Sequence, residues 1–409
     1  MNLNYAYKDL LKILNGKAEG QTPDQHFTTV AYDSRNIVNG QSTVFFALKG
    51  PFRDGHQFIS DAYAKGVRCF VVSNAPRSND FSHAGFIVVK NTLHALQELA
   101  AHHRNQFSFP VVAITGSAGK TTVKEWIYHL LGKHKRIIRS PKSFNSQLGV
   151  ALSLLELHND CDLALIEAGI SAPGEMLRLE QMIRPTHGVF TSFGRAHEEN
   201  FKSREEHLHE KTLLFASVKQ TIYSSSLGLS LQTEKSIHGL AVTPATYQKD
   251  LKFLPYTDPV SVNNAMLAIA FTRSVLGNSV DLKEAISTLP QLALRLETFD
   301  GLSRNTIIND TYNLDLDAFT HSLEYQMRLA GKRKRIVIVG LDAASRSKAD
   351  QIEKIVKPYK VDQLLIIDPN ETPELIESEA VVLIKGTRNA DMQRLARQYR
   401  LKKHTTYVE

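Results

Sequence analysis

Apolar segments of strand length alternate with amphipathic segments of helix length from residue 110 to about residue 290. A strand followed by a helix and then by another strand of the same sheet forms a parallel pair, with the helix packed on one face. The alternation therefore predicts the α/β class, with a doubly wound parallel sheet covered by helices on both faces. The expected strands are 111–115, 136–140, 162–169 and 188–194, and the expected helices are 121–134, 146–157 and 174–183.

Shorter α/β patterns flank this central region. At about 150 residues per domain, a chain of 409 residues is expected to form about three domains. The first pattern combines an expected helix over 5–14 with short extended segments, and Pro110 opens the first central strand. A third pattern starts near Leu296. We predict three unlike α/β domains, at 1–108, 109–290 and 291–409.

Composition excludes several classes of protein. The chain is 42% hydrophobic and 22% charged, which is typical of a globular protein. No apolar run reaches the roughly 18 residues that a membrane-spanning helix needs. Lys8 and Asp9 interrupt the stretch that would be apolar in a signal peptide. The two cysteines, Cys69 and Cys161, are too few for a disulfide framework or a zinc site, so we expect buried thiols in a cytoplasmic protein without membrane insertion.

The net charge of +7 is spread along the chain. The densest basic run, 332–335, directly precedes an apolar strand and is expected to form a solvated turn. A nucleic-acid-binding protein would need a broader basic face with stacking aromatic side chains, so no nucleic-acid partner is expected. The mild basicity favours an anionic substrate instead.

The most informative segment is the turn after the first central strand, residues 114–122. Its glycines allow backbone N–H groups to turn inward, and the helix that follows presents its N-terminus to an anion. The spacing G-x-x-G-K-T-T is shorter than the common phosphate-loop pattern, which has glycine where this chain has Ile114. The segment predicts nucleotide binding, with Lys120 along the β- and γ-phosphates and the Thr121 hydroxyl on Mg²⁺. The expected ATP-binding residues of the loop are Gly116, Ser117, Ala118, Gly119, Lys120, Thr121 and Thr122.

Two later strands of the central region also end in polar side chains. Glu167 closes the apolar strand 162–169, and His197 follows the strand 188–194. Ligands bind at the carboxyl ends of strands in doubly wound sheets, so Glu167 could reach the same metal as Thr121. A solvated acid and a structural histidine are the alternatives for these two residues.

Together these motifs resemble the Mur ligases, the ATP-dependent amide-forming enzymes of peptidoglycan precursor synthesis. The resemblance rests on TGSAGKTT (115–122), on IEAG (166–169) followed by Pro-Gly-Glu-Met, and on TSFGRAH (191–197) followed by Lys211. It covers essentially the whole chain.

Segments in the flanking domains narrow the resemblance. Asp-Ser-Arg at 33–35, FFALKG at 45–50 and DGHQFI at 54–59 resemble the uridine-nucleotide domain of the two ligases that act last. The segment 309–313, NDTYN, resembles a motif of the final one, and the Asp-Asn-Pro-Arg signature of the diaminopimelate-adding member is absent from the sequence.

The resemblance implies the substrates and the reaction. The terminal carboxylate of a UDP-N-acetylmuramoyl-tripeptide would be activated as an acyl phosphate at the expense of ATP, with Mg²⁺, and D-alanyl-D-alanine would then displace phosphate. A monomer is expected.

The resemblance also implies roles for residues of the central domain. Lys120 would neutralise the β/γ-phosphates, Thr121 and Glu167 would hold one Mg²⁺, and His197 would help to hold a second. Lys211 would be carbamylated and would act as an anionic metal ligand. The further implied contacts are Asn145 at the reacting centre, Asn264 on the adenine side, Arg295 facing phosphate, Asp310 on the ribose hydroxyls, and Ser34 and Arg35 on the uridine diphosphate.

Several positions depart from the family pattern. Ala118 stands where the family usually has Asn or Asp, and Ser192 replaces a usual Asn. The segments 314–316 and 340–344 match poorly, so the third domain is where the resemblance is weakest.

Two other functions stay open at this point. A ligase like folyl-polyglutamate synthase shares the ATP chemistry but is expected to lack the first-domain motifs, and a non-catalytic nucleotide-binding protein could keep the fold alone. The final residues, 404–409, resemble the opening strand of an alanine racemase. They predict that the chain is the ligase half of a longer polypeptide, in which a dimeric racemase domain would make the protein a dimer.

Overall fold

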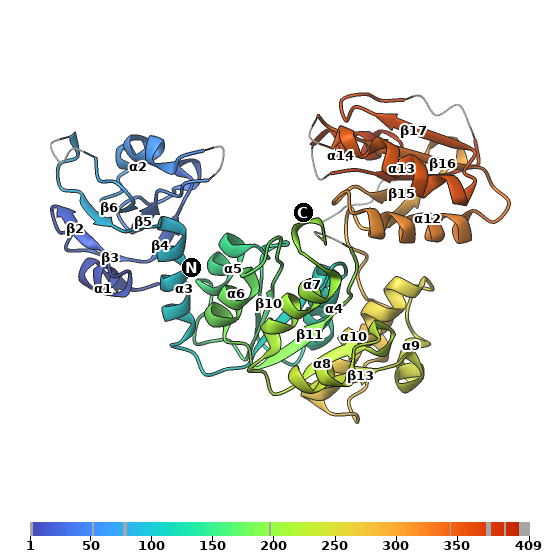
Figure 1. Ribbon diagram of the computed structural model, residues 1–409, viewed down its shortest axis with the longest axis horizontal. Helices are drawn as coiled ribbons and strands as arrows, with labels where there is room; N and C mark the ends of the chain where they lie inside the picture. The colour runs from blue at the N-terminus through green and yellow to red at the C-terminus, as the bar shows by residue number, and fades with distance from the viewer. Residues whose placement is uncertain are drawn as a thin grey trace. The chain divides into compact units, whose positions relative to one another are not determined.

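The chain folds into two compact units. The computed structural model describes residues 3–50, 53–76, 80–195, 198–343, 345–373, 378–387 and 390–400. The first unit comprises 1–193, 197–253 and 263–285, and the second comprises 194–196, 254–262 and 286–409. Each unit is built on mostly parallel sheets with helices, which confirms the α/β class (Figure 1). The second unit's long segment starts near the predicted boundary at 290, and the division into three domains stays a prediction.

A six-stranded parallel sheet forms the centre of the first unit, in the order β13-β12-β11-β8-β10-β9. Every residue of β8 and β10 is buried, as expected for strands covered on both faces. After β8 the chain builds β9 and β10 on one side and then β11 on the other, so the strand order reverses at β8. The strands are β8 (Val111–Thr115), β9 (Ile137–Arg139), β10 (Leu163–Glu167), β11 (His187–Phe190), β12 (Thr221–Ser224) and β13 (Gly239–Val242).

The amino-terminal part of the same unit carries a five-stranded sheet in the order β2-β7-β6-β5-β4 and a small antiparallel pair, β1 with β3. The expected helix over 5–14 was wrong at its start, because Tyr5 pairs with Phe27 in β1 and the helix begins only at Tyr7. The edge strand β2 was not expected, since all four of its residues are exposed and show no apolar pattern. The strands are β1 (Tyr5–Ala6), β2 (Lys17–Gly20), β3 (His26–Phe27), β4 (Thr29–Ala31), β5 (Thr43–Phe46), β6 (Cys69–Val72) and β7 (Gly85–Val88).

Helix α3 (Thr92–Arg104) joins the two large sheets of the first unit. It packs on α5 and α6, and Figure 1 shows it between these helices and the amino-terminal sheet. One continuous apolar cluster includes Phe46 of that sheet, Leu99 of α3, Val150 of α5 and Ile166 of β10. The first unit therefore has a core that runs through both of its large sheets. Its other helices are α1 (Tyr7–Ile13), α2 (Ile59–Ala64), α4 (Lys120–Leu131), α5 (Gln147–Leu154), α6 (Glu175–Ile183), α7 (Arg204–Thr212), α8 (Leu231–Ser236) and α9 (Gln248–Leu251).

The second unit is built on a five-stranded sheet in the order β14-β15-β18-β16-β17, parallel except for β14. Its strands are β14 (Glu297–Asp300), β15 (Thr306–Asp310), β16 (Arg335–Gly340), β17 (Gln363–Ile367) and β18 (Val381–Lys385), and its helices are α12 (Leu316–Ala330), α13 (Ala349–Val356) and α14 (Ala390–Gln398). Helices α10 (Pro259–Leu276) and α11 (Lys283–Ser287) contain residues of both units.

Composition led to predictions for the cysteines, for the basic run 332–335 and for membrane-spanning helices. Cys69 and Cys161 are buried free thiols, and burial raises the pKa of each. In the basic run before β16, Lys332 and Lys334 are exposed, whereas Arg333 and Arg335 donate hydrogen bonds to Leu329 O and Tyr359 O. No helix among the described residues is long and apolar enough to cross a membrane.

Arg104 provides a test of the contact between α3 and α6. Its buried guanidinium donates hydrogen bonds to the carbonyls of Ile183, Arg184 and Phe107, at 2.9, 3.2 and 2.6 Å. Arg104→Met would leave these carbonyls without their donor, and a buried acceptor without a partner costs about 1–3 kcal/mol. We expect unfolding of the first unit to become about 2–4 kcal/mol easier, measured by denaturant titration with the fluorescence of the single tryptophan, Trp126.

The matched control for this variant is Arg136→Met. The Arg136 side chain is 67% exposed and pairs with Asp162 at 3.1 Å. An exposed ion pair contributes about 0–1 kcal/mol, so this variant is expected to unfold almost as the unchanged protein does. Equal effects of the two substitutions would show that Arg104 does not secure α3.

Candidate active site

The carboxyl ends of three neighbouring strands, β10, β8 and β11, lie side by side in the central sheet. Glu167 pairs in register with Ile114, and Phe190 pairs with Thr115. The predicted phosphate loop follows β8, the predicted carboxylate ends β10, and Thr191 and Ser192 follow β11. Since ligands bind in this kind of sheet where the strand order reverses, these three strand ends form the candidate site.

The phosphate loop needs glycine at two positions. Gly119 has φ +83° and is the N-cap of α4, and a Cβ there would lie 2.5 Å from Asn264 Oδ1. Gly116 has φ +149°, and a Cβ there would lie 2.1 Å from Thr191 Oγ1. Both the backbone conformation and the close neighbours exclude a side chain. The Lys120 ammonium donates a hydrogen bond to Gly116 O at 2.6 Å, so it lies over the loop.

Side chains after β11 hold the loop in place. Ser192 Oγ accepts a hydrogen bond from Ala118 N at 2.8 Å and donates to Ala118 O at 3.0 Å. Thr191 Oγ1 also donates to Ala118 O, at 2.5 Å. Ala118 and Ser192, the two positions that depart from the family pattern, are therefore in direct contact. The Ser192 hydroxyl holds the backbone of Ala118, whose own side chain is apolar. Asn264, in α10, is buried beside the loop at Gly119.

The Glu167 carboxylate and the Thr121 hydroxyl are brought together, as the sequence predicted. Thr121 Oγ1 donates a hydrogen bond to Glu167 Oε2 at 3.1 Å and lies 2.7 Å from Ser143 Oγ. The other oxygen, Oε1, is buried 3.0 Å from the Lys124 ammonium and accepts no hydrogen bond from a described residue. The ammonium thus balances the carboxylate at Oε1, while Oε2 lies beside a hydroxyl, and a carboxylate oxygen next to a hydroxyl is a donor set that suits a hard cation. Thr121 and Glu167 therefore fit Mg²⁺.

Lys211 lies near the loop despite its distance in sequence. It is 2% exposed in α7, and burial together with the Lys120 ammonium lowers the pKa of Lys211 to about 7. The preceding residue, Glu210, fixes the helix: its Oε1 accepts a hydrogen bond from Met176 N, at the start of α6, at 3.0 Å. No local sequence pattern predicts this placement.

Asn145 and His197 are the remaining predicted residues of the central region. The backbone carbonyl of Asn145 accepts a hydrogen bond from Gly169 N at 2.8 Å, so Asn145 lies next to the end of β10. His197 lies outside the described residues. Sequence analysis did not single out Lys124, Ser140 or Ser143. The one available signal was the spacing of Lys120 and Lys124, which places both on one face of a helix.

Arg295 and Asp310 belong to the second unit. The Arg295 guanidinium lies 3.8 Å from the centre of the Tyr312 ring. Asp310 ends β15 directly opposite Lys385 of β18, and its Oδ2 accepts from the Lys385 ammonium and from Ser322 Oγ, at 2.6 Å each. These contacts fix the Asp310 carboxylate within its own sheet.

Ser34 and Arg35 lie in a short turn after β4. The Ser34 side chain is buried, whereas the Arg35 side chain is 75% exposed and pairs with Asp33 at 2.6 Å. This guanidinium lowers the pKa of Asp33 to about 2. A hollow of about 510 Å³ begins at the same turn, between the end of the amino-terminal sheet and the segment after β9. Its lining includes Asp33, Asn36, Thr43, Pro141, Phe144 and Glu156, but not Ser34 or Arg35.

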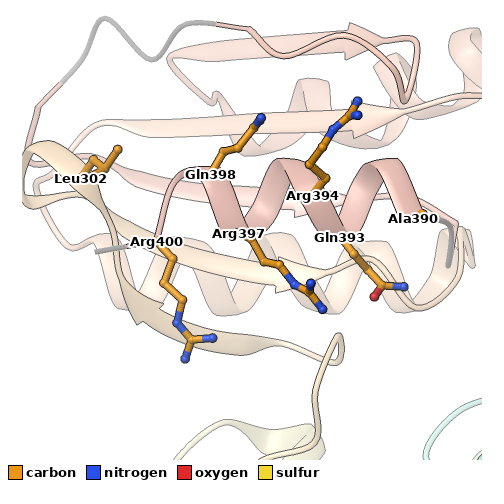
Figure 2. A pocket seen from close by; sticks show the side chains of 7 residues that line it. All are labelled: Leu302, Ala390, Gln393, Arg394, Arg397, Gln398 and Arg400. Carbon is orange, nitrogen blue, oxygen red and sulfur yellow. The ribbon is translucent and has the colours of Figure 1, made fainter. Parts of the chain in front are cut away.

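A second hollow, of about 710 Å³, lies along α14 in the second unit (Figure 2). Arg397 and Arg400 point to one side of the helix and Arg394 to the other. The Arg400 guanidinium packs over the Phe299 ring, 4.7 Å from its centre. None of the predicted site residues lines this hollow.

Gly119→Ala tests the phosphate loop. The substitution places a Cβ against Asn264 in a backbone conformation that L-residues rarely adopt. We expect the affinity for ATP, measured by calorimetry, to fall about 100-fold, because the loop can no longer turn its N–H groups inward. Gly228→Ala is the control, since Gly228 also has a positive φ, +58°, but nothing lies within 4 Å of the added Cβ. Equal losses in the two variants would contradict the assignment of the loop.

Comparisons with known proteins agree with this geometry. Residues 114–226 match the family "Mur ligase middle domain", and residues 26–104 match "Mur ligase family, catalytic domain". The UDP-N-acetylmuramoyl-tripeptide--D-alanyl-D-alanine ligase of Bacillus subtilis (strain 168) is 27% identical, with 82% of this chain and 79% of the relative covered. The corresponding Escherichia coli (strain K12) ligase is 26% identical, with 97% and 98% covered.

Solved structures show the same fold. MurF from Acinetobacter baumannii has a TM-score of 0.80 at 20% identity and covers 97% of this chain and 99% of its own. MurF ligase from Thermotoga maritima in complex with ADP has a TM-score of 0.71 at 21% identity, with 90% and 96% covered. The folylpolyglutamate synthase of Mycobacterium tuberculosis is more distant, with a TM-score of 0.57 at 12% identity and 76% of this chain covered. The loop, the strand ends around it and the relatives that match over most of their length lead to one conclusion: this chain is similar to the Mur ligases in both of its matched domains and in its fold.

Proposed function

We propose that this chain is an ATP-dependent amide ligase that adds D-alanyl-D-alanine to UDP-N-acetylmuramoyl-tripeptide through an acyl phosphate. The observation that carries the proposal is the Thr121–Glu167 pair directly beneath the glycine loop, with the buried Lys211 close to Lys120. The curated relatives with this activity match this chain over most of their length and support the choice of substrates.

The first step joins two anions. The terminal carboxylate of the tripeptide attacks the γ-phosphorus of ATP, the bond to the bridging oxygen breaks, and ADP leaves. The backbone N–H groups of the loop and the Lys120 ammonium offset the charge of the phosphates. Since phosphoryl transfer depends on position and electrostatics, a loop fixed by Ser192 and Thr191 contributes by holding these donors still.

The second step forms the amide. The amine of D-alanyl-D-alanine attacks the acyl carbon, loses a proton and expels phosphate through a tetrahedral intermediate. We assign Asn145, beside the end of β10, to the reacting centre. Asn264 would lie on the adenine side, and from the second unit Arg295 would face phosphate and Asp310 the ribose hydroxyls. Hydrogen bonds from Lys385 and Ser322 fix the orientation of the Asp310 carboxylate.

Mg²⁺ would be held by Thr121 and Glu167, and it would supply a positive charge that lowers the repulsion between the phosphates and the incoming carboxylate. His197 would provide a further ligand. Lys211 would provide another after carbamylation: its neutral amine attacks CO₂, an N–C bond forms, one C=O electron pair moves to oxygen, and one amine proton leaves. The resulting anionic oxygen is the type of ligand that Mg²⁺ prefers.

The uridine end of the substrate would lie at the turn 33–36. The hollow of about 510 Å³ opens there and reaches Phe144, in the loop that also carries Asn145. A substrate bound in it would extend from the amino-terminal sheet toward the reacting centre. We propose that Ser34 and Arg35 contact the diphosphate.

The alternatives have less support. The folylpolyglutamate synthase is the more distant structural neighbour and covers 76% of this chain. A protein that only binds a nucleotide would not need a second lysine buried close to the lysine of the loop, where the two ammonium groups repel each other. We place the enzyme in the cytoplasm, where ATP is available. A monomeric state stays a prediction, and the resemblance to a racemase falls on residues outside the described part of the chain.

Phosphate release tests the function. We expect rapid release from ATP only when both UDP-N-acetylmuramoyl-tripeptide and D-alanyl-D-alanine are present, because the acyl phosphate needs the first and its breakdown needs the second. A coupled phosphate assay and mass spectrometry of the UDP-linked product measure the two outcomes. Release stimulated instead by a folate and glutamate would favour the synthase, and no release with any acceptor would favour the non-catalytic alternative.

Lys120→Ala separates the two binding sites. The variant is expected to lose about 1,000-fold or more in phosphate release, because the ammonium no longer offsets charge in the transition state. The binding of the UDP-linked substrate, measured by calorimetry, is expected to stay within about twofold. Ligation at the unchanged rate would show that the loop was assigned wrongly.

Carbamylation of Lys211 predicts a specific pH dependence. Only the neutral amine reacts with CO₂, and with a pKa of about 7 about half of the amine is neutral at pH 7. Activity is therefore expected to fall as the pH drops below about 7 and to recover partly with added bicarbonate. ¹³C NMR with labelled CO₂ should detect a carbamate signal that Lys211→Arg lacks.

Variants of Lys211 test what the position supplies. Lys211→Ala is expected to lose about 100-fold in activity and to regain part of it with a small added carboxylate. Lys211→Arg should stay inactive, because a guanidinium cannot act as an anionic ligand. Full activity of the arginine variant would show that positive charge suffices and would end the carbamate proposal.

A further inference from the structure

Lys124 is a buried lysine that the proposed reaction leaves without a role. It lies in α4, one turn after Lys120, and its side chain is 0% exposed. Burial of an ammonium is costly unless several oxygens replace the water it loses. Lys124 Nζ donates hydrogen bonds to Ser140 O at 2.6 Å and Lys142 O at 2.5 Å.

Two carboxylates complete the surroundings of this ammonium. Glu167 Oε1 and Glu125 Oε1 each lie 3.0 Å from Lys124 Nζ. Glu125 is in turn paired with Arg139, whose Nε lies 2.9 Å from Glu125 Oε2 and whose guanidinium stacks on the Tyr128 ring at 3.5 Å. Charges of opposite sign thus alternate from the partly exposed Arg139 inward to Glu167.

The contacts of Lys124 connect three separate segments. The helix α4 supplies the ammonium, the end of β10 supplies Glu167, and the loop after β9 supplies two carbonyls. That loop also carries Ser143, which lies 2.7 Å from Thr121 Oγ1. Ser140 Oγ accepts a hydrogen bond from Glu167 N at 3.0 Å, so the loop and the strand end are joined a second time.

The two oxygens of Glu167 have different neighbours as a result. Lys124 lies next to Oε1, whereas Oε2 faces Thr121. A carboxylate on a flexible side chain has several rotamers, and the ammonium favours the one that turns Oε2 toward the hydroxyl. The neutral side chain of a methionine would leave this orientation undetermined and the carboxylate without its counter-charge.

We propose that Lys124 is a positioning residue that orients Glu167 and the loop 140–146 for divalent-cation binding. This inference rests on the proposed function, since it takes the cation site at Thr121 and Glu167 as given. The same ammonium also repels a cation by Coulomb's law, so removing it could strengthen cation binding if position did not matter. The sign of the change in cation affinity therefore separates positioning from simple repulsion.

The experiment uses Mn²⁺ as the probe, with the full chain and ADP, and follows free Mn²⁺ by electron paramagnetic resonance. For Lys124→Met we expect Mn²⁺ affinity to fall at least tenfold, while ADP affinity in EDTA stays within about twofold. In Mg²⁺-dependent turnover, the KM for Mg²⁺ is expected to rise by more than kcat falls. The control is Lys133→Met, because Lys133 is 75% exposed just after the same helix, and it should match the unchanged protein.

Lys124→Arg keeps the inference testable if the methionine variant does not fold. The guanidinium keeps the charge, but it is planar and larger than the ammonium, so it cannot meet the same two carbonyls and two carboxylates in a fully buried site. We expect a threefold to tenfold loss of Mn²⁺ affinity in a folded protein. Unchanged Mn²⁺ affinity in this variant would assign Lys124 to folding alone and overturn the positioning role.

Two further results would be decisive. A folded Lys124→Met variant that binds Mn²⁺ as tightly as the unchanged protein, or more tightly, would overturn the inference. Failure of the unchanged protein to bind Mn²⁺ with ADP would instead contradict the proposed cation site, and with it the function on which the inference rests.

Discussion

The meeting of three parallel strand ends is the constraint on which the rest of the site depends. Because β10, β8 and β11 are neighbours in register, a carboxylate, a glycine turn and a pair of hydroxyls reach the same edge of the sheet. Neither the glycine turn nor the carboxylate would keep its position without groups from neighbouring segments. The turn needs Thr191 and Ser192 to hold its backbone, and the Glu167 carboxylate needs an ammonium to balance its charge in a buried site.

Burial determines the chemistry of the lysines around this edge. Lys124 is surrounded by oxygens that favour its charge, whereas burial and Lys120 act against the charge of Lys211 and lower its pKa to about 7. Two buried lysines of the same unit thus differ in chemical role through their partners alone. One is a counter-ion to buried carboxylates, and the other has the lowered pKa on which the proposed carbamylation depends.

Sequence patterns predicted the parts of this arrangement that are local. The apolar strands 111–115 and 162–169, the glycine turn and the terminal glutamate are readable because strand, turn and helix propensities act within about ten residues. The family resemblance is confirmed by relatives over most of the chain. Lys124 could not be recognised, because its partners come from the loop after β9 and from β10. The start of α1 was predicted wrongly for a similar reason, since Tyr5 pairs with Phe27, 22 residues later in the chain.

The helix α3 has a consequence for how such a ligase could change in evolution. It is the last element of the amino-terminal fold, and it also packs against the helices of the central sheet. Leu99 of this helix lies in one apolar cluster with Phe46 and Ile166. An amino-terminal module attached in this way cannot be exchanged for another by recombination at the linker, because the incoming helix would have to fit the ridges of α5 and α6. If the turn 33–36 binds the nucleotide end as proposed, specificity would therefore diverge by substitutions there, while the helix between the two large sheets changes slowly.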